Sequence, residues 1–264
     1  MKKLLILGVL GALLLPSCKK ETTTTSPTNS LSNTILNTNL DVITFNPNIS
    51  YGSVTDIDGN VYKTVKIAGK EWMAENLKVR KFNNGDTIGT VDWFSDASKF
   101  INWDYEIDRP LYKFLDFDSL SAAKSFKTVG LHYNWTVIKD SRNVCPSSWH
   151  IPSENEYTNL INNLGGMYLA SNKLKEVGVV HWKESLVTST NSSGFTAIPS
   201  GSFNMITINR SSFAYFWTST LVDNPDVSYK NSFAKVLFLS SYDSIAKITS
   251  HRVINAGSIR CIKD

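Results

Sequence analysis

The clearest local signal in the chain is Cys145-Pro-Ser-Ser-Trp-His-Ile-Pro-Ser-Glu-Asn-Glu-Tyr157. It predicts a helix that starts after Ser153, because the serine hydroxyl can accept from a free backbone N–H and Glu156 can reach back to the N–H of Ser153. The apolar face of this helix follows at the i, i+3, i+4, i+7 spacing as Tyr157, Leu160, Ile161 and Leu164. Gly165-Gly166 predicts its end, since glycine takes the left-handed conformation without a Cβ clash.

Segments rich in β-branched and aromatic residues lie on both sides of this helix and predict strands. A hairpin is expected around the Asp-Gly turn of residues 56–60, and later strands over residues 131–137, 195–199, 215–220, 232–240, 245–253 and 258–262. A second helix is expected over residues 170–177, ended by Gly178. Strands that flank two central helices favour an α+β fold with a mostly antiparallel sheet.

The hairpin turn also has the start of a calcium-loop spacing, with Asp56, Asp58 and Asn60 at alternate positions. The complete pattern is missing, because Val61 stands at the position of the loop glycine and Ile67 at that of the final glutamate. A plain hairpin is the favoured interpretation. The four histidines also lack short metal-ligand spacing, so no metal and no cofactor is expected.

The N-terminus resembles the signal peptide of bacterial lipoproteins. Lys2 and Lys3 precede a short apolar run, Leu4 to Leu15, which is too short to span a bilayer. Leu15-Pro-Ser-Cys18 is similar to a lipobox, which implies cleavage before Cys18 and acylation of that residue. The alternative is an ordinary secretory signal with a chance cysteine.

These signals divide the chain into three parts. Residues 1–17 are expected to be the signal peptide, and residues 18–50, rich in Ser, Thr and Asn, a tether that cannot bury enough surface to fold. Residues 51–264 are expected to form one folded domain, a length that supports a substantial core.

Three cysteines make an odd count, which needs an explanation in an exported protein. Acylation of Cys18 would leave Cys145 and Cys261 as a pair in an oxidising compartment, where a disulfide can persist. Two buried free thiols are the alternative.

Charge argues against a nucleic-acid partner. The formal charge is only +4, two of the lysines lie in the signal peptide, and the remaining Lys and Arg are scattered without a basic stripe.

Eight short motifs follow one another in an order that resembles the Fibrobacter succinogenes major paralogous domain, over about residues 53–264. They are Asp56-Ile-Asp-Gly-Asn-Val-Tyr62, Trp72-Met-Ala-Glu-Asn-Leu77, Tyr133-Asn-Trp135, Cys145-Pro-Ser-Ser-Trp-His-Ile-Pro-Ser153, Lys173-Leu-Lys-Glu176, Ser193-Gly-Phe-Thr-Ala197, Trp217-Thr-Ser-Thr220 and Ile259-Arg-Cys-Ile-Lys-Asp264. The chain departs from the family pattern at Tyr157 and Phe216, where tryptophan is usual, and in a longer stretch at 80–130. That family occurs in exported proteins and lipoproteins of Bacteroidetes and has no established biochemical activity.

A wider resemblance bears on the fold. Residues 151–157 and 259–261 are similar to the corresponding parts of formylglycine-generating enzymes, which have a C-type-lectin-like fold. Such folds often tie the first helix region to the last strand by a cystine, and this implies pairing of Cys145 with Cys261. The catalysis of those enzymes needs two reactive cysteines, which this pairing would consume.

These observations favour a non-catalytic binding module on a lipid anchor, in an exported protein of the envelope and most simply of the outer membrane. Its ligand would be a glycan or a protein, and Trp103, Trp182, Asp223 and Asp226 are the candidate contacts, on aromatic- and carboxylate-containing loops. The alternatives are a structural envelope or adhesin subunit that binds another bacterial protein, and an enzyme of unknown reaction. No Ser elbow, phosphate loop or nucleotide fingerprint is present in the sequence.

Overall fold

The computed structural model describes residues 42–90, 109–113, 126–183, 188–204, 206–208, 211–222 and 232–264. The chain divides into compact units at Met1–Asn37 and Thr38–Asp264, and all the described residues belong to the second unit. Cys18, Trp103, Asp223 and Asp226 lie outside the described residues, so the predictions made for them remain predictions.

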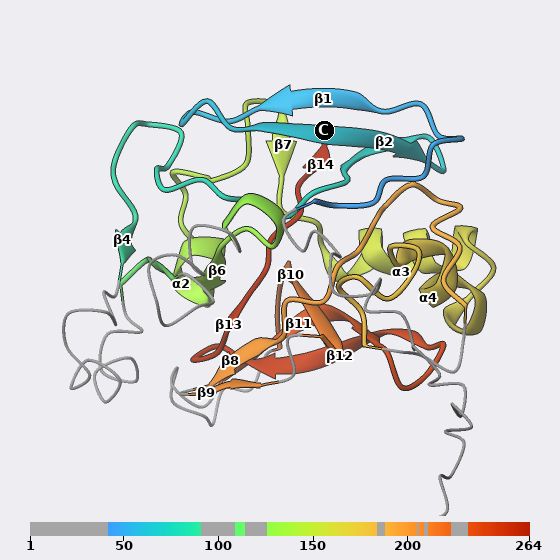
Figure 1. Ribbon diagram of the computed structural model, residues 1–264. Coiled ribbons are helices and arrows are strands. Elements are labelled where there is room, and N and C mark those ends of the chain that lie inside the picture. The colour runs from blue at the N-terminus through green and yellow to red at the C-terminus, as the bar shows by residue number, and fades with distance from the viewer. Residues whose placement is uncertain are drawn as a thin grey trace, which may run out of the picture. The chain divides into compact units, whose positions relative to one another are not determined.

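A five-stranded antiparallel sheet contains both ends of the folded part. It holds β1 (Gly52–Thr55), β2 (Val61–Ile67), β3 (Lys70–Met73), β7 (Trp149–His150) and β14 (Ile262–Lys263), in the order β1-β2-β3-β14-β7. The expected hairpin around residues 56–60 is therefore present, as β1 and β2. The last strand of the chain lies between β3 and β7, at the top of Figure 1.

A second sheet is an antiparallel meander of β10 (Phe213–Val222), β11 (Phe233–Ser240) and β12 (Ala246–Arg252). It lies at the bottom of Figure 1. The expected strands at 215–220, 232–240 and 245–253 correspond to these three. One face of the meander is apolar and fully buried, with Ala214, Phe216, Leu237, Leu239 and Ala246.

The third sheet is built from short strands distant in sequence. Its order is β4 (Gly89–Thr90), β5 (Leu111–Lys113), β6 (His132–Asn134), β13 (Ala256–Gly257), β8 (Ser202–Asn204) and β9 (Ile206–Ile208). Its strands pair antiparallel except for β4 with β5, which is parallel. The structure is thus an α+β fold whose sheets are mostly antiparallel.

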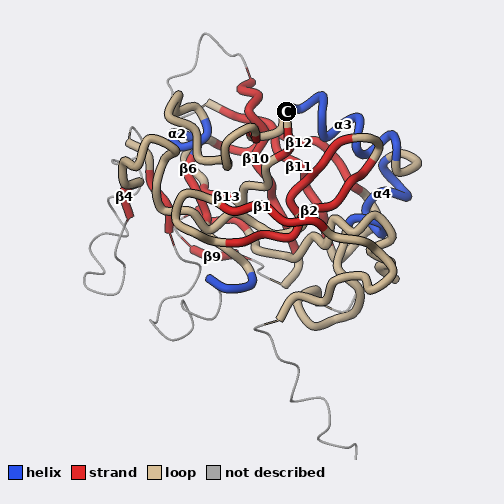
Figure 2. The backbone as a smooth tube through the Cα atoms, turned by 90° about the horizontal axis from the view of Figure 1, so that it is seen from above, coloured by secondary structure: helices blue, strands red, loops and turns tan. Residues whose placement is uncertain are grey.

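The predicted capped helix is confirmed as α3 (Glu154–Asn163). Ser153 is its N-cap, the hydroxyl of Ser153 accepts from the N–H of Glu156, and the Glu156 carboxylate accepts from the N–H of Ser153. The helix buries the face carrying Tyr157, Leu160 and Ile161. Figure 2 shows α3 and α4 on the same side of the strands.

Four local expectations are wrong in detail. The second helix is α4 (Met167–Leu174), three residues earlier than expected, because Gly166 at its start has a φ of 86° that breaks the chain from α3. The strand expected over 131–137 turns into α2 (Trp135–Ile138) after Asn134, whose side chain caps that helix. Residues 195–199 form no ladder strand, and Thr196 has a φ of 54°, outside the extended region. Of 258–262, only Ile262 is in a ladder strand, β14.

The packed region begins before Tyr51, the residue at which the folded domain was expected to start. Residues 42–51, which include a turn closed by the hydrogen bond from the N–H of Ile49 to the carbonyl of Asn46, are here called the N-terminal strap. The backbone N–H of Thr44 donates to Glu176 Oε1 at 2.6 Å, and Asn46 Nδ2 donates to the carbonyl of Asn191 at 3.0 Å. Ile43 is buried in the same segment.

Cys145 and Cys261 are joined by a disulfide across 116 residues of sequence. Both cysteines are fully buried in an apolar cluster with Trp149, Ile151 and Ile259. The bond therefore ties the segment ahead of α3 to the segment ahead of β14, which is the pairing that the resemblance implied.

Candidate functional site

Several polar residues of the sequence motifs are buried and form hydrogen bonds within the domain. Arg260 is fully buried, and its guanidinium donates to Asn76 Oδ1 at 2.8 Å, to the carbonyl of Thr196 at 2.8 Å and to the carbonyl of Phe195. It also lies over the rings of Phe195 and Phe216. Burial lowers the pKa of Arg260 to about 9, so the side chain remains a cation at neutral pH, solvated by carbonyl oxygens in place of water.

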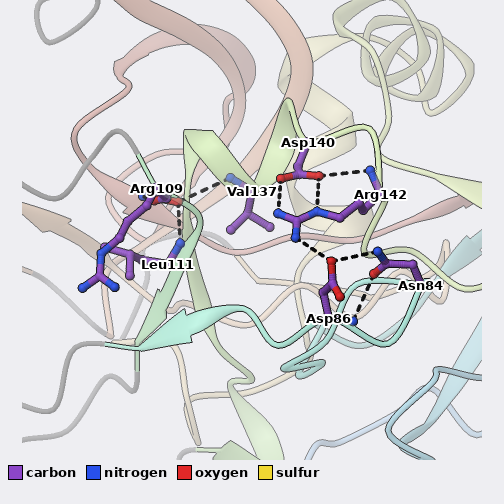
Figure 3. Close-up of polar contacts among 8 residues, drawn as sticks. Asn84, Asp86, Arg109, Leu111, Val137, Asp140 and Arg142 are labelled. Atoms are coloured by element: carbon purple, nitrogen blue, oxygen red, sulfur yellow. Dashed lines mark hydrogen bonds and ion pairs between the residues drawn. The ribbon is translucent and has the colours of Figure 1, made fainter.

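Asn134 has a similar role at the other end of the domain. Its Oδ1 accepts from the N–H of Leu111 and of Val137, and its Nδ2 donates to the carbonyl of Arg109. One buried amide thereby caps α2 and holds β5 beside β6. Figure 3 labels Arg109, Leu111 and Val137.

The neighbouring turn is fixed by an ion-pair cluster. Arg142 contacts Asp140 at 2.6 Å and Asp86 at 2.9 Å, and Asn84 Nδ2 donates to Asp86 (Figure 3). The hydrogen bonds from Arg142 lower the pKa of both carboxyl groups. Asp86 is exposed, so we assign this cluster to orientation of a loop and not to chemistry.

The spacing that suggested calcium belongs to the hairpin turn. The carboxylate of Asp56 accepts from the N–H of Asp58, from the N–H and side-chain amide of Asn60, and from the hydroxyl of Tyr62. Both carboxylate oxygens of Asp56 therefore already accept hydrogen bonds from the hairpin. Among the described residues, no group of three or more His, Cys, Asp or Glu is arranged to hold a metal ion.

His150 bridges two carboxylates at the surface. Its Nδ1 lies 2.6 Å from Asp264 Oδ1 and its Nε2 lies 2.9 Å from Glu156 Oε1. Partial burial lowers the pKa of His150, but the hydrogen bonds to Asp264 and Glu156 outweigh that effect and the pKa is raised. Glu156 is also occupied by the N-cap of α3, so this cluster locks the last residue of the chain to the helix start.

The bridge makes a measurable prediction. In an NMR titration, the imidazole of His150 is expected to titrate above its ordinary value of about 6.5, and Asp264→Asn should lower that pKa. Because the folded pKa is raised, the bridge stabilises the fold below the unfolded pKa, and this contribution is lost as pH rises through the folded pKa. The side chains are partly exposed, so we expect an effect of about 1 kcal/mol or less. Titration at or below the ordinary value would contradict the arrangement.

An open groove lies between the N-terminal strap and the β2–β3 hairpin. Its volume is about 740 Å³, within the usual range for small-ligand sites. Two other segments complete it, namely Leu164 just after α3, and Ser192 with Ser193. The strap contributes Asn48, Ile49, Ser50 and Tyr51, and Gly52 follows at the start of β1. The hairpin contributes Thr64, Val65, Lys66, Ile67, Ala68 and Glu71.

Gly194 allows the strap to approach this closely. Its φ is 74°, and a Cβ atom at this position would come within 2.8 Å of Ile49 and 2.9 Å of Val65, both of which line the groove. A side chain here would therefore displace one wall of the groove. This is the physical use of the glycine in the Ser193-Gly-Phe-Thr-Ala197 motif.

The lining of the groove mixes apolar and polar groups. Thr64 donates to Glu71 Oε1 at 2.7 Å, and Lys263 lies 3.3 Å from Glu71 Oε2. The hydrogen bond from Thr64, assisted by Lys263, lowers the pKa of Glu71, so Glu71 is a carboxylate at neutral pH. Lys66 and Ser192 are exposed beside it. This lining can hydrogen-bond a polar ligand and pack its apolar part.

Sequence reasoning selected other residues for ligand contact. Trp182 was expected to contact a ligand, but the structure places it in the core. Its side chain is 2% exposed, its indole N–H donates to the carbonyl of Ala197 at 2.9 Å, and it packs with Leu174. It has no surface to offer a ligand. The groove was missed because its walls come from four separate segments, and no local pattern marks them.

The protein is thus an α+β domain with buried hydrogen-bond networks around Arg260 and Asn134 and with an open groove on its surface. The chain belongs to the Fibrobacter succinogenes major domain family, whose match covers residues 65–263. No curated protein and no solved structure matches the chain. Within the part of the chain that the structure describes, no helix is long and apolar enough to cross a membrane.

Proposed function

We propose that this protein is a lipid-anchored envelope protein whose domain is a C-type-lectin-like, non-catalytic module that binds a glycan or a protein in the groove. The groove carries this proposal, because it is a formed concave site lined by both apolar and hydrogen-bonding groups. The buried motif residues support it, since Arg260 and Asn134 hold the framework from inside and do not line the groove.

The layout of the domain supports the lectin-like assignment. The first strands and the last strand share one sheet, and the cystine ties the region ahead of α3 to the region ahead of β14. The cystine is the feature that the sequence resemblance to C-type-lectin-like folds led us to expect.

Binding is tested with an array of glycans and of envelope and host proteins, probed with the mature protein with and without calcium. A ligand of the groove should bind to the wild type and be lost when Ser192→Trp fills the groove. Tyr168→Trp is the matched control, because Tyr168 is 65% exposed on α4 and does not line the groove. Silence across the array, or binding that Ser192→Trp leaves intact, would count against the groove.

The anchor gives a separate prediction. Cys18→Ser is expected to abolish incorporation of labelled fatty acid, because it removes the residue that would be acylated. The protein should then be released from the membrane fraction, because stable anchoring needs more than one acyl chain. The free energy of unfolding of the domain should stay unchanged. Fatty-acid labelling that persists in Cys18→Ser would refute the lipoprotein assignment.

A further inference from the structure

Exposed apolar side chains gather around α4. Eleven large hydrophobic residues are exposed in the part of the chain that the structure describes, and six of them belong to this one region. Soluble domains rarely leave such residues in a group unless a partner or a membrane covers them. The six residues, here called the α4 surface, are Val42, Met167, Tyr168, Leu169, Val177 and Val179.

The packing of α4 directs these side chains outward. The helix buries Ala170, Ser171 and Leu174 against the domain, so its opposite side, with Tyr168 and Leu169, faces away from the core. Figures 1 and 2 both show α4 at the outer edge of the domain. Because the eight residues of α4 are only about 12 Å long, the exposed residues at its start lie close to those just after its end.

The chain enters the domain at this same surface. The N–H of Thr44 donates to Glu176 Oε1 at 2.6 Å, which fixes the strap to the residue just before Val177. Val42, two residues ahead of Thr44, is the first described residue and is exposed. The chain of about 24 residues that leads from Cys18 to Val42 reaches at most about 80 Å when fully extended. A membrane that holds Cys18 therefore keeps the α4 surface within its reach.

The charge of this region suits a layer of anionic lipid headgroups. Residues 157–183 contain one acidic residue, Glu176, and its side chain is fully buried. Two basic residues of the same stretch reach the surface, Lys173 on α4 and Lys183 beyond it. A surface with exposed apolar and basic groups is attracted by anionic headgroups and can bury its apolar groups at the boundary with the acyl chains. No exposed carboxylate within this stretch opposes that approach.

We propose that the α4 surface is the face with which the domain lies on the lipid bilayer. Tyr168 and Leu169 enter the boundary between headgroups and acyl chains, and Lys173 contacts lipid phosphates. The inference rests on the lipid anchor of the proposed function, because the anchor keeps the surface near the bilayer and a few apolar side chains alone bind it weakly. None of the six residues lines the groove, so the groove stays open to a ligand while the domain is on the membrane.

The test is co-sedimentation of the mature, non-acylated Cys18→Ser protein with vesicles of phosphatidylethanolamine and phosphatidylglycerol, at a ratio of about three to one. In this background, Tyr168→Ser with Leu169→Ser should weaken binding about tenfold without a change in melting temperature, since two exposed apolar side chains are lost. Ile57→Ser with Val61→Ser is the matched control, because it removes two exposed apolar side chains at the β1–β2 hairpin, and should bind as the parent does. Lipids brominated on their acyl chains should quench the fluorescence that Tyr168→Trp adds.

Three results would overturn the proposal. One is the absence of vesicle binding by the Cys18→Ser protein, which leaves the anchor standing if the wild type incorporates fatty acid in cells. Another is equal vesicle binding by the α4 pair of serine variants and the hairpin pair. The last is a dimer in sedimentation equilibrium that the α4 pair dissociates, which would show that a second copy covers this surface. Vesicle binding that needs Tyr168 and Leu169, in a protein that incorporates no fatty acid, would support the surface and refute the anchor.

Discussion

Replacing both Cys145 and Cys261 with serine is expected to lower the free energy of unfolding by about 4–5 kcal/mol. The bond closes a loop with a sequence separation of 116, and in the chain-entropy model a loop of this size gives a large contribution because it restricts the unfolded chain. That is a major part of the total stability of about 5–15 kcal/mol typical of a domain. Urea unfolding measures the change directly.

Each single serine variant should lose about as much as the double variant, because either one removes the same bond. Cys18→Ser is the matched control, since it removes a cysteine outside the folded unit. Non-reducing peptide mapping of the protein purified from the envelope should recover Cys145 and Cys261 in one cross-linked pair of peptides. Free alkylation of both thiols without reductant would show that the bond is absent in the cell.

Arg260→Ala is expected to destabilise the domain by about 3–5 kcal/mol, since removing a buried charged donor leaves its partners without hydrogen bonds. The acceptors left behind are Asn76 Oδ1 and the carbonyls of Phe195 and Thr196. The space over the rings of Phe195 and Phe216 would also empty. Chemical denaturation compared with wild type gives the magnitude.

Two further variants separate charge from geometry at this position. Arg260→Lys keeps the charge but offers one ammonium in place of a planar fork, so we expect it to recover only part of the loss. Lys263→Ala, three residues on, removes a half-exposed cation that pairs with Glu71, and should cost less than about 1 kcal/mol. If Arg260→Ala and Lys263→Ala were equally stable, the buried network would not support the framework as described.

Local chemistry explains which elements could be predicted. The capping box of Ser153 and Glu156, with the apolar spacing after it, lies within a dozen consecutive residues, and α3 followed the prediction. The hairpin at residues 56–60 and the meander of β11 and β12 also depend on neighbouring residues and on alternation along the strands. The disulfide pairing rested on a resemblance and on the cysteine count.

Long-range contacts explain why the other elements could not be predicted from the sequence. Asn134 ends β6 and starts α2 because its side chain is fixed by Arg109 and Leu111, from a segment more than 20 residues earlier. Trp182 has an ordinary loop sequence around it, and only the fold shows that Ala197 accepts its indole N–H. The contact of Tyr215 with Phe238 depends on the register of β10 with β11, which places these two residues opposite each other.

The N-terminal strap has a mechanical consequence. A force that pulls on the chain ahead of residue 42 first loads the bonds of Thr44 to Glu176 and of Asn46 to Asn191. Apolar packing holds the strap as well, because Ile43 is buried and Phe45, Ile49 and Tyr51 pack against the core. The core behind the strap is also cross-linked by the cystine. Since Asn48 to Gly52 form one wall of the groove, a force that peeled the strap away would open that wall before it reached the cross-linked core. With the proposed lipid anchor ahead of the strap, tension on the anchor would then shorten the time for which a ligand is retained.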